Sequence, residues 1–192
     1  MKTDLEGGWL EYFKDFLSED ERNSLFQSLY HDTPWQQGEI RIFGKFVKTP
    51  RLEAFYAEDG LNYSYSGQQL KVHEFTPLLL SLKEKIEAIS EESYNSVLIN
   101  LYRDGSDSNG WHADNEKELG INPIIASLSL GSERRFDLRH NSNSNKIQFI
   151  LHPGSLLIMG GELQHNWKHQ IAKSKRITQA RINLTFRKII ED

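Results

Sequence analysis

The chain of 192 residues contains no cysteine, which excludes disulfide bonds, cysteine-ligated zinc and iron–sulfur clusters. Any bound metal must therefore be held by histidine, aspartate or glutamate. The chain also lacks an apolar run of the roughly 20 residues that a membrane span needs. Its first residues, MKTDLEGGWLEYF, lack the layout of a signal peptide. We therefore expect one soluble domain over residues 1–192, cytoplasmic in a bacterium or nuclear in a eukaryote.

Acidic residues are absent from residues 163–190, although the net charge of the whole chain is -4. The basic residues of this stretch are Lys168, Lys173, Lys175, Arg176, Arg181, Arg187 and Lys188. A second basic stretch carries Arg41, Lys45, Lys48 and Arg51 against one acidic residue, Glu39. Basic patches of this kind can follow nucleic-acid phosphates. A solvated charged surface explains each stretch, taken alone, about as well.

Two segments before residue 92 have helical patterns. Ser18-Glu-Asp-Glu21 is a capping box, which predicts a helix from about Glu19 to Leu29. A second helix is predicted after Pro77, because apolar residues recur there at helical spacing and form one stripe, namely Leu79, Leu82, Ile86 and Ile89. We interpret the apolar face of each predicted helix as facing the core.

After residue 92 the pattern changes to period two, with turn signals between short segments. The predicted strands are 96–102, 124–130, 135–139, 146–151, 155–159, 166–171 and 181–187. Many short strands favour a sandwich or a jelly-roll barrel. Because the helices come first and the strands later, we expect one α+β unit with the helices packed outside the sheet.

The segment Trp-His-Ala-Asp is the first chemical signal. His112 and Asp114 are two residues apart, so on an extended segment both side chains reach the same ion. Two imidazoles and one carboxylate form the facial triad that holds non-haem Fe(II). Either His165 or His169 could supply the second imidazole, whereas His152 before Pro-Gly is more typical of a turn. A surface histidine and aspartate after a loop remain the alternative.

The segment RINLTFR is the second signal. Arg181, Asn183, Thr185 and Arg187 share one face of a predicted strand. If that face lines a barrel interior, two arginines there require buried anions, which a five-carbon dicarboxylate would provide. If it meets solvent, the strand is simply amphipathic. Asn100 and Tyr102 share a face of an earlier strand and could bind the same co-substrate, although a buried asparagine needs a partner in any case.

At these residues the sequence resembles the AlkB family of Fe(II)/2-oxoglutarate-dependent nucleic-acid dealkylases. The resemblance runs from about Phe13 to Ile190 and rests on VLINLYRDG, WHADNEKEL, IASLSLG, HPGSLLIM and RINLTFRK. It is greatest to homologues acting on double-stranded DNA, which carry segments similar to RIFGKFVKTPR and GLNYSYSG. It implies a catalytic double-stranded β-helix (jelly-roll) over about 93–190. Helices and nucleotide-recognition segments would then occupy about 1–92.

The resemblance implies Fe(II), 2-oxoglutarate and O2 as cofactors. It assigns iron, and so the catalytic centre, to His112, Asp114 and His169. Arg181 would bind the distal carboxylate of 2-oxoglutarate, and Arg187 would lie near the carboxylate that chelates iron. The full set implied to bind the co-substrate is Asn100, Tyr102, Arg181, Asn183 and Arg187.

The resemblance also assigns substrate contacts. Phe43 would fill the gap left in the duplex, beside phosphate-holding cations that include Arg51. The segment with Tyr63 and Tyr65 would stack on the flipped base, and Glu116 would meet its exocyclic amino group. Where the family often has a second aspartate the chain has Asn115, a departure that concerns base preference and not the iron site.

The implied reaction is oxidative demethylation of bases such as 1-methyladenine and 3-methylcytosine in alkylated DNA, releasing formaldehyde, succinate and CO2. We expect a monomer that prefers duplex DNA, with RNA also open. The alternatives are an oxygenase of the same class acting on RNA, protein or a small molecule, a non-catalytic nucleic-acid-binding module, and a metal-free jelly-roll protein.

Overall fold

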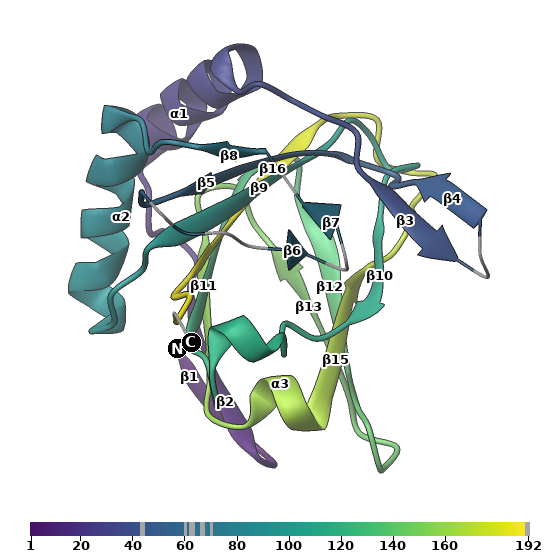
Figure 1. The fold of residues 1–192 in the computed structure, drawn as a ribbon. Helices are drawn as coiled ribbons and strands as arrows, with labels where there is room; N and C mark the ends of the chain where they lie inside the picture. The colour runs from purple at the N-terminus through teal and green to yellow at the C-terminus, as the bar shows by residue number, and fades with distance from the viewer. Residues whose placement is uncertain (43–44, 60, 62–63, 66–67, 70, 191–192) are drawn as a thin grey trace.

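The protein is built around two β-sheets that face each other, with two long helices outside the larger sheet (Figure 1). The computed structural model describes all residues except 43–44, 60, 62–63, 66–67, 70 and 191–192. The helices are α1 (Glu19–Asp32), α2 (Pro77–Ser90) and the short α3 (Leu163–Asn166), and a 3-10 turn spans Lys117–Leu119. No described helix is long and apolar enough to cross a membrane.

The larger sheet has eight strands, and all its pairs are antiparallel except that of the last two. In spatial order they are β1 (Lys2–Leu5), β2 (Gly8–Phe13), β14 (Leu156–Gly160), β11 (Ile125–Gly131), β16 (Arg181–Arg187), β9 (Ser96–Tyr102), β5 (Leu52–Ala57) and β8 (Val72–His73). The smaller sheet has the order β10 (Asn109–His112), β15 (Trp167–Ile171), β12 (Arg134–His140) and β13 (Lys146–Leu151). Two hairpins complete the fold, β3 (Glu39–Ile42) with β4 (Lys45–Lys48) and β6 (Ser64–Tyr65) with β7 (Gln68–Gln69). The predicted α+β jelly-roll is confirmed.

Both predicted helices are present. The side chain of Ser18 accepts a hydrogen bond from the Glu21 amide, and the Glu21 carboxylate accepts one from the Ser18 amide, so the capping box starts α1 as predicted. In α2, three residues of the predicted stripe are buried, but Ile89 is 39% exposed. Ile89 lies roughly 60° around the helix from Ile86, because each residue advances about 100°. It therefore falls at the edge of the stripe, away from the sheet.

The N-terminal half is richer in strands than predicted, since β1, β2 and β5 all join the larger sheet. The expected order of helices first and strands later is therefore wrong. In β5 nearly every residue is buried, so its sequence LEAFYA shows no alternation of apolar and polar residues. In β2, by contrast, most residues are only half-buried beside the edge strand. Neither strand has the period-two signal on which the prediction depended.

The larger sheet separates an apolar layer from a polar interior. On β16, Ile182, Leu184 and Phe186 pack with the helices in one core, together with alternate residues of β9. The residues between them on β16 are polar and equally buried, and they turn toward the smaller sheet. A second core, which includes Leu138 and Trp167, packs between the sheets. The fold thus places polar side chains inside a closed barrel.

Candidate metal centre and co-substrate cavity

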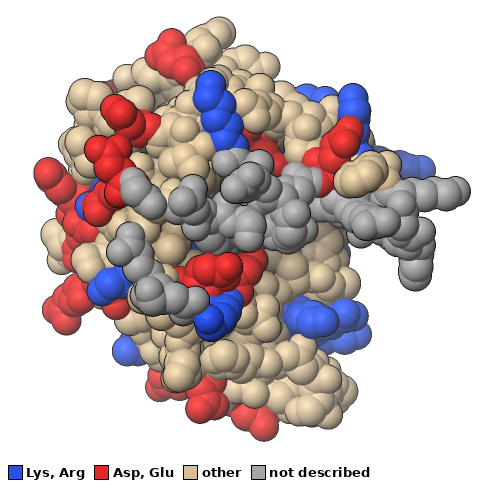
Figure 2. Space-filling model, viewed as in Figure 1, with Lys and Arg blue, Asp and Glu red and all other residues tan. Residues whose placement is uncertain are grey.

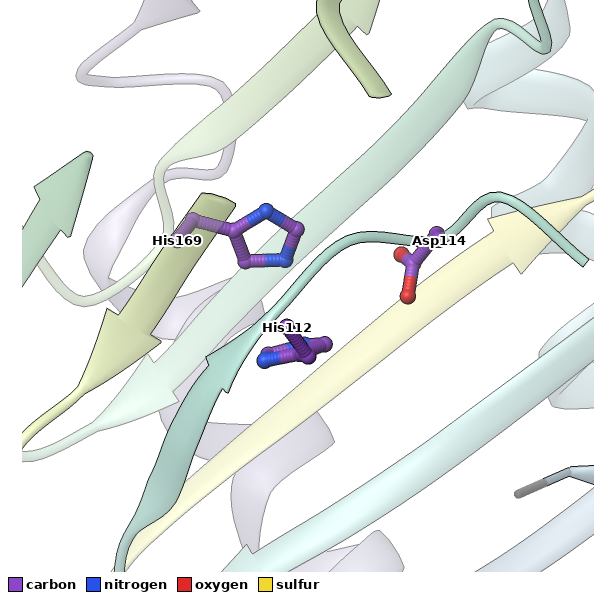
Figure 3. Close-up of side chains that lie close together, drawn as sticks. All are labelled: His112, Asp114 and His169. Carbon is purple, nitrogen blue, oxygen red and sulfur yellow. The ribbon is translucent and has the colours of Figure 1, made fainter. Parts of the chain in front are cut away.

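Three potential metal ligands lie close together at β10, β15 and the segment that follows β10. His112 ends β10 and is the register partner of His169 on β15, with 4.2 Å between the ring centroids. Asp114 follows two residues later. One ligand atom from each of the three residues lies within 4.8 Å of the others, and Figure 3 shows the side chains converging from separate segments. His165, the other candidate from the sequence, is exposed in α3 and lies outside this cluster.

Neighbouring groups orient the ligands. Nδ1 of His112 lies 2.7 Å from the carbonyl oxygen of Gly110. Because a carbonyl can only accept, Nδ1 donates this hydrogen bond, and Nε2 carries the lone pair that a metal needs. The amide N–H of Asp114 donates to Oε1 of Gln164 over 3.0 Å. Oδ2 of Asp114 accepts from Nη2 of Arg187 over 3.0 Å. Buried Oδ1 has no hydrogen-bond partner among the described residues, so one ligand position remains for a cation.

The charges at the cluster suit a divalent metal. Burial, helped by the nearby His112 imidazole, lowers the pKa of His169 to about 3. Burial also lowers the pKa of His112. Burial alone would raise the pKa of Asp114, but Arg187 and the two imidazoles lower it to about 2. At neutral pH the cluster therefore holds two neutral imidazoles and one carboxylate, the protonation states that metal binding requires.

Arg181 lies beside this cluster as a buried cation that is only partly satisfied. Its exposed fraction is 1%. Nη2 donates to Oγ of Ser129 over 2.9 Å and also to Oδ1 of Asn183. Nε and Nη1 have no hydrogen-bond partner within the described part of the chain. Burial lowers the pKa of Arg181 to about 10, so it remains charged at neutral pH. A carboxylate could accept a hydrogen bond from either of these nitrogens.

One cavity joins the metal cluster to Arg181. Asn100, Tyr102 and Asn183 line it with polar groups, and its apolar lining comes from Leu98, Phe136, Leu151, Met159 and Ile171. The ring of Tyr102 lies 5.3 Å from the guanidinium carbon of Arg181. The five residues that the sequence assigned to the co-substrate all line this cavity. The cavity thus brings the metal cluster, the buried cation Arg181 and further hydrogen-bonding groups together.

The predicted substrate residues are placed less uniformly. Phe43 and Tyr63 lie outside the described residues, and the side chain of Tyr65 is likewise not described. Glu116 is partly buried, and its Oε2 has no hydrogen-bond partner among described groups. Burial, and then the negative charge of Asp114, raises the pKa of Glu116, which indicates that its carboxyl lies close to the metal cluster.

Arg51 lies deeper than the expected phosphate contact would suggest. It was expected beside the cations that hold phosphates, and it is 5% exposed. Its Nε donates to Oδ1 of Asn100 over 2.9 Å, and its Nη2 lies 3.8 Å from Glu53. The reason is its position on the same inward face as Asn100 and Tyr102, which the basic composition of its surroundings could not reveal.

Four further residues at the site were missed by sequence reasoning. Asn109 approaches Nε2 of His112 with its amide nitrogen, 3.1 Å away. The other three each hydrogen-bond one residue of the site: Gln164 binds Asp114, Ser127 binds Asn183, and Ser129 binds Arg181. The alternation of β11 could have suggested Ser127 and Ser129, which share one face of that strand. Nothing in the sequence around Gln164 indicated its contact fifty residues away.

Comparison with known proteins agrees with this geometry. Residues 9–187 match the model of the 2OG-Fe(II) oxygenase superfamily. The chain is 38% identical over 187 residues to bovine alpha-ketoglutarate-dependent dioxygenase alkB homolog 3, covering 92% of this chain and 65% of that protein. It is 34% identical over 181 residues to human DNA oxidative demethylase ALKBH2, covering 88% and 69%. This chain belongs to the AlkB family of 2OG-Fe(II) oxygenases. The match spans about 65% of the length of the bovine relatives.

Solved structures support the fold of this AlkB-family chain. The structure of OsALKBH1 superposes with a TM-score of 0.62 at 17% identity, covering 97% of this chain and all of that one. A prolyl hydroxylase from Trichoplax adhaerens, solved with a hypoxia inducible factor peptide, gives a TM-score of 0.65 at 12% identity and covers 94% and 83%. The superfamily uses Fe(II), 2-oxoglutarate and dioxygen, and the triad and cavity of this chain fit them.

Proposed function

We propose that this protein is an Fe(II)/2-oxoglutarate-dependent dioxygenase that repairs alkylated DNA by oxidative demethylation, acting on bases such as 1-methyladenine and 3-methylcytosine. One observation carries the proposal: a His-Asp-His cluster shares a cavity with a buried arginine, two nitrogens of which have no hydrogen-bond partner among the described residues. The relatives named DNA oxidative demethylases, at 34% identity, support the choice of substrate.

In this proposal His112, Asp114 and His169 hold the iron, and the co-substrate lies between the iron and Arg181. When bound, iron and 2-oxoglutarate supply the oxidising chemistry, in which dioxygen is consumed, succinate and CO2 form, and the hydroxylated methyl group leaves as formaldehyde.

The chain itself contributes placement. Arg181 pairs with the distal carboxylate through a nitrogen that has no partner among the described residues, while Ser129 and Asn183 hold its Nη2. Arg187 holds Oδ2 of Asp114, so the carboxylate keeps Oδ1 directed toward the metal. The apolar walls of the cavity, among them Phe136, exclude water from the reacting groups.

Recognition of the base depends on charge. A methylated ring of this kind carries positive charge, and the partly buried carboxyl of Glu116 lies beside the metal cluster with one unpartnered oxygen. We propose that Glu116 meets the exocyclic amino group of the base, while Tyr65 stacks on it with Tyr63 nearby. Phe43 would fill the vacated place in the duplex.

The surface charge supports a nucleic-acid partner. In Figure 2 acidic side chains gather on the side of α1 and α2, and basic ones are more frequent on the opposite side. Lys173, Lys175 and Arg176 are all exposed in the loop after β15, and Lys48 is exposed on β4. We propose that these lysines and arginines contact phosphates of duplex DNA, and that residues 1–192 act as one domain and as a monomer.

The test is anaerobic addition of Fe(II) and 2-oxoglutarate, followed by air and a duplex that contains 1-methyladenine. Mass spectrometry should find succinate and restored adenine in matched yield. Succinate without repair would direct the search to RNA or protein substrates. If a folded, iron-loaded sample gives neither product, the catalytic proposal is wrong and a binding module remains.

Paired variants test the ligand assignment. Asp114→Ala and His169→Ala should each abolish turnover while circular dichroism remains unchanged. His165→Ala is the matched control, because His165 is exposed only four residues away from His169. Turnover retained in His169→Ala but lost in His165→Ala would reverse the assignment.

A further inference from the structure

Behind the co-substrate cavity, β5 contributes a buried pair of opposite charges. Arg51 precedes the strand, and Glu53 lies in it as the register partner of Asn100 on β9. The exposed fractions are 5% for Arg51 and 2% for Glu53. Neither residue lines the cavity, whereas Asn100 does. The pair therefore lies beside the cavity lining, next to Asn100.

The contact between Arg51 and Asn100 has a defined direction. Nε of Arg51 lies 2.9 Å from Oδ1 of Asn100. A guanidinium has donors and no acceptor, so only the oxygen of the amide can face it. The NH2 group of Asn100 must then point away from Arg51. Since Asn100 lines the cavity, its two N–H donors are available on the side where a carboxylate of the co-substrate would lie.

Glu53 keeps the guanidinium in place. Its Oε2 lies 3.8 Å from Nη2 of Arg51 and has no hydrogen-bond partner among the described residues. Burying such a pair is costly, and apolar replacements are often as stable. The value of such a pair is geometric: it fixes where Arg51 points.

We infer that Arg51 is a positioning residue of the 2-oxoglutarate site, which turns the Asn100 amide so that its NH2 group faces the cavity, with Glu53 holding Arg51 in register. This inference rests on the proposed function, because it presumes that the cavity binds 2-oxoglutarate. It replaces the sequence-based role of Arg51 as a phosphate contact with an indirect role in co-substrate binding.

Calorimetric titration of 2-oxoglutarate into the Mn(II)-loaded protein, without oxygen, tests the inference. Arg51→Lys keeps a cation beside Glu53 but loses Nε, so the Kd should rise about tenfold, the loss expected for a hydrogen bond to a charged group. Asn100→Ala should also weaken binding. The double variant should bind no more weakly than Asn100→Ala alone, because Arg51 acts through Asn100.

Controls separate positioning from general damage. Arg139→Lys, on the exposed outer face of β12, should leave the Kd unchanged. If Arg51→Lys folds poorly, Glu53→Gln keeps the side-chain shape and should weaken 2-oxoglutarate binding in the same direction. Affinity for methylated duplex DNA and its salt dependence should not change in Arg51→Lys, whereas a phosphate contact would reduce both.

The outcomes distinguish this inference from the proposed function. If the wild type binds 2-oxoglutarate and Arg51→Lys binds it equally well, or if the losses add in the double variant, the positioning role is wrong and the proposed function stands. If the Mn(II)-loaded wild type does not bind 2-oxoglutarate at all, both are wrong.

Discussion

Two buried arginines near the ring of Tyr102 should respond oppositely to the same substitution. The guanidinium carbons of Arg134 and Arg181 lie 5.5 Å and 5.3 Å from the centre of the Tyr102 ring. Arg134 donates to the carbonyl oxygens of Asp104, Asp107 and Ala172, so its donors are used within the protein. In Arg181, Nε and Nη1 have no hydrogen-bond partner in the part of the chain that the structure describes. We predict that Arg134→Met destabilises the protein and that Arg181→Met, without co-substrate, stabilises it.

The magnitude follows from burial. The pKa of Arg181 falls from its ordinary value of 12.5 to about 10, chiefly through burial. This fall corresponds to about 3 kcal/mol of cost for the charged form. Losing the hydrogen bonds to Ser129 and Asn183 offsets about 1–2 kcal/mol of that gain. Arg181→Met should therefore raise the free energy of unfolding by about 1–2 kcal/mol. Arg134→Met should lower it by about 3 kcal/mol, because three carbonyls lose their partner.

Urea unfolding of the metal-free and the Mn(II)-loaded protein, each with and without 2-oxoglutarate, measures both effects. Added 2-oxoglutarate should stabilise the Mn(II)-loaded wild type and leave Arg181→Met unaffected, since a ligand stabilises only the state that binds it. If Arg181→Met is destabilised by more than about 1 kcal/mol in the absence of co-substrate, its guanidinium is already satisfied within the protein. The interpretation of Arg181 as an anion site waiting for its ligand would then be refuted.

Three further predictions concern the metal cluster and the core. The pKa of His169 is about 3 in the folded protein, well below its ordinary 6.5, so the unfolded chain binds the extra proton first. The free energy of unfolding of the metal-free protein should thus be highest above pH 6.5 and fall by up to about 1.4 kcal/mol per pH unit as the pH drops from there toward 3. Urea unfolding at pH 7 and pH 5 measures this difference, and His169→Gln should make it smaller. Gln164→Leu removes the acceptor for the Asp114 amide, so the metal affinity should fall about tenfold or more. Competition with a chelator measures this affinity, and an unchanged value would show that Gln164 does not orient the ligand. Leu184→Ala, in the core behind the cavity, should lower the free energy of unfolding by about 2–5 kcal/mol. The folded fraction should bind 2-oxoglutarate with an unchanged Kd, and a higher Kd would show that the apolar layer shapes the site.

The sequence alone was sufficient for much of the catalytic half. Strands 96–102, 146–151 and 181–187 begin and end where their alternation predicted. Alternation works there because one side of each strand faces a different environment from the other. It failed for β5, whose sequence LEAFYA does not alternate between apolar and polar residues, and for β2, where most residues are only half-buried. These strands depend on their partners in the sheet for their structure, and a single segment does not reveal its partners.

The site divides in the same way. The spacing of His112 and Asp114, and the polar face of residues 181–187, are local properties, so the sequence by itself determined that a metal and an anion were to be expected. Residue spacing left His165 and His169 open, and the family resemblance assigned His169. The register of β10 with β15, which joins residues 57 positions apart in the chain, places His169 opposite His112, and no local pattern could reveal that pairing.

Burial decided the rest. Composition made Arg51 look like a surface cation, but the pairing of β5 with β9 directs it inward to Asn100. Likewise, the sequence contains the arginine at position 181 but not the information that two of its nitrogens find no partner among the residues that the structure describes. Residue types determine which chemistry is available. Strand register and the exclusion of water determine which groups meet, and which charges are left for a ligand to satisfy.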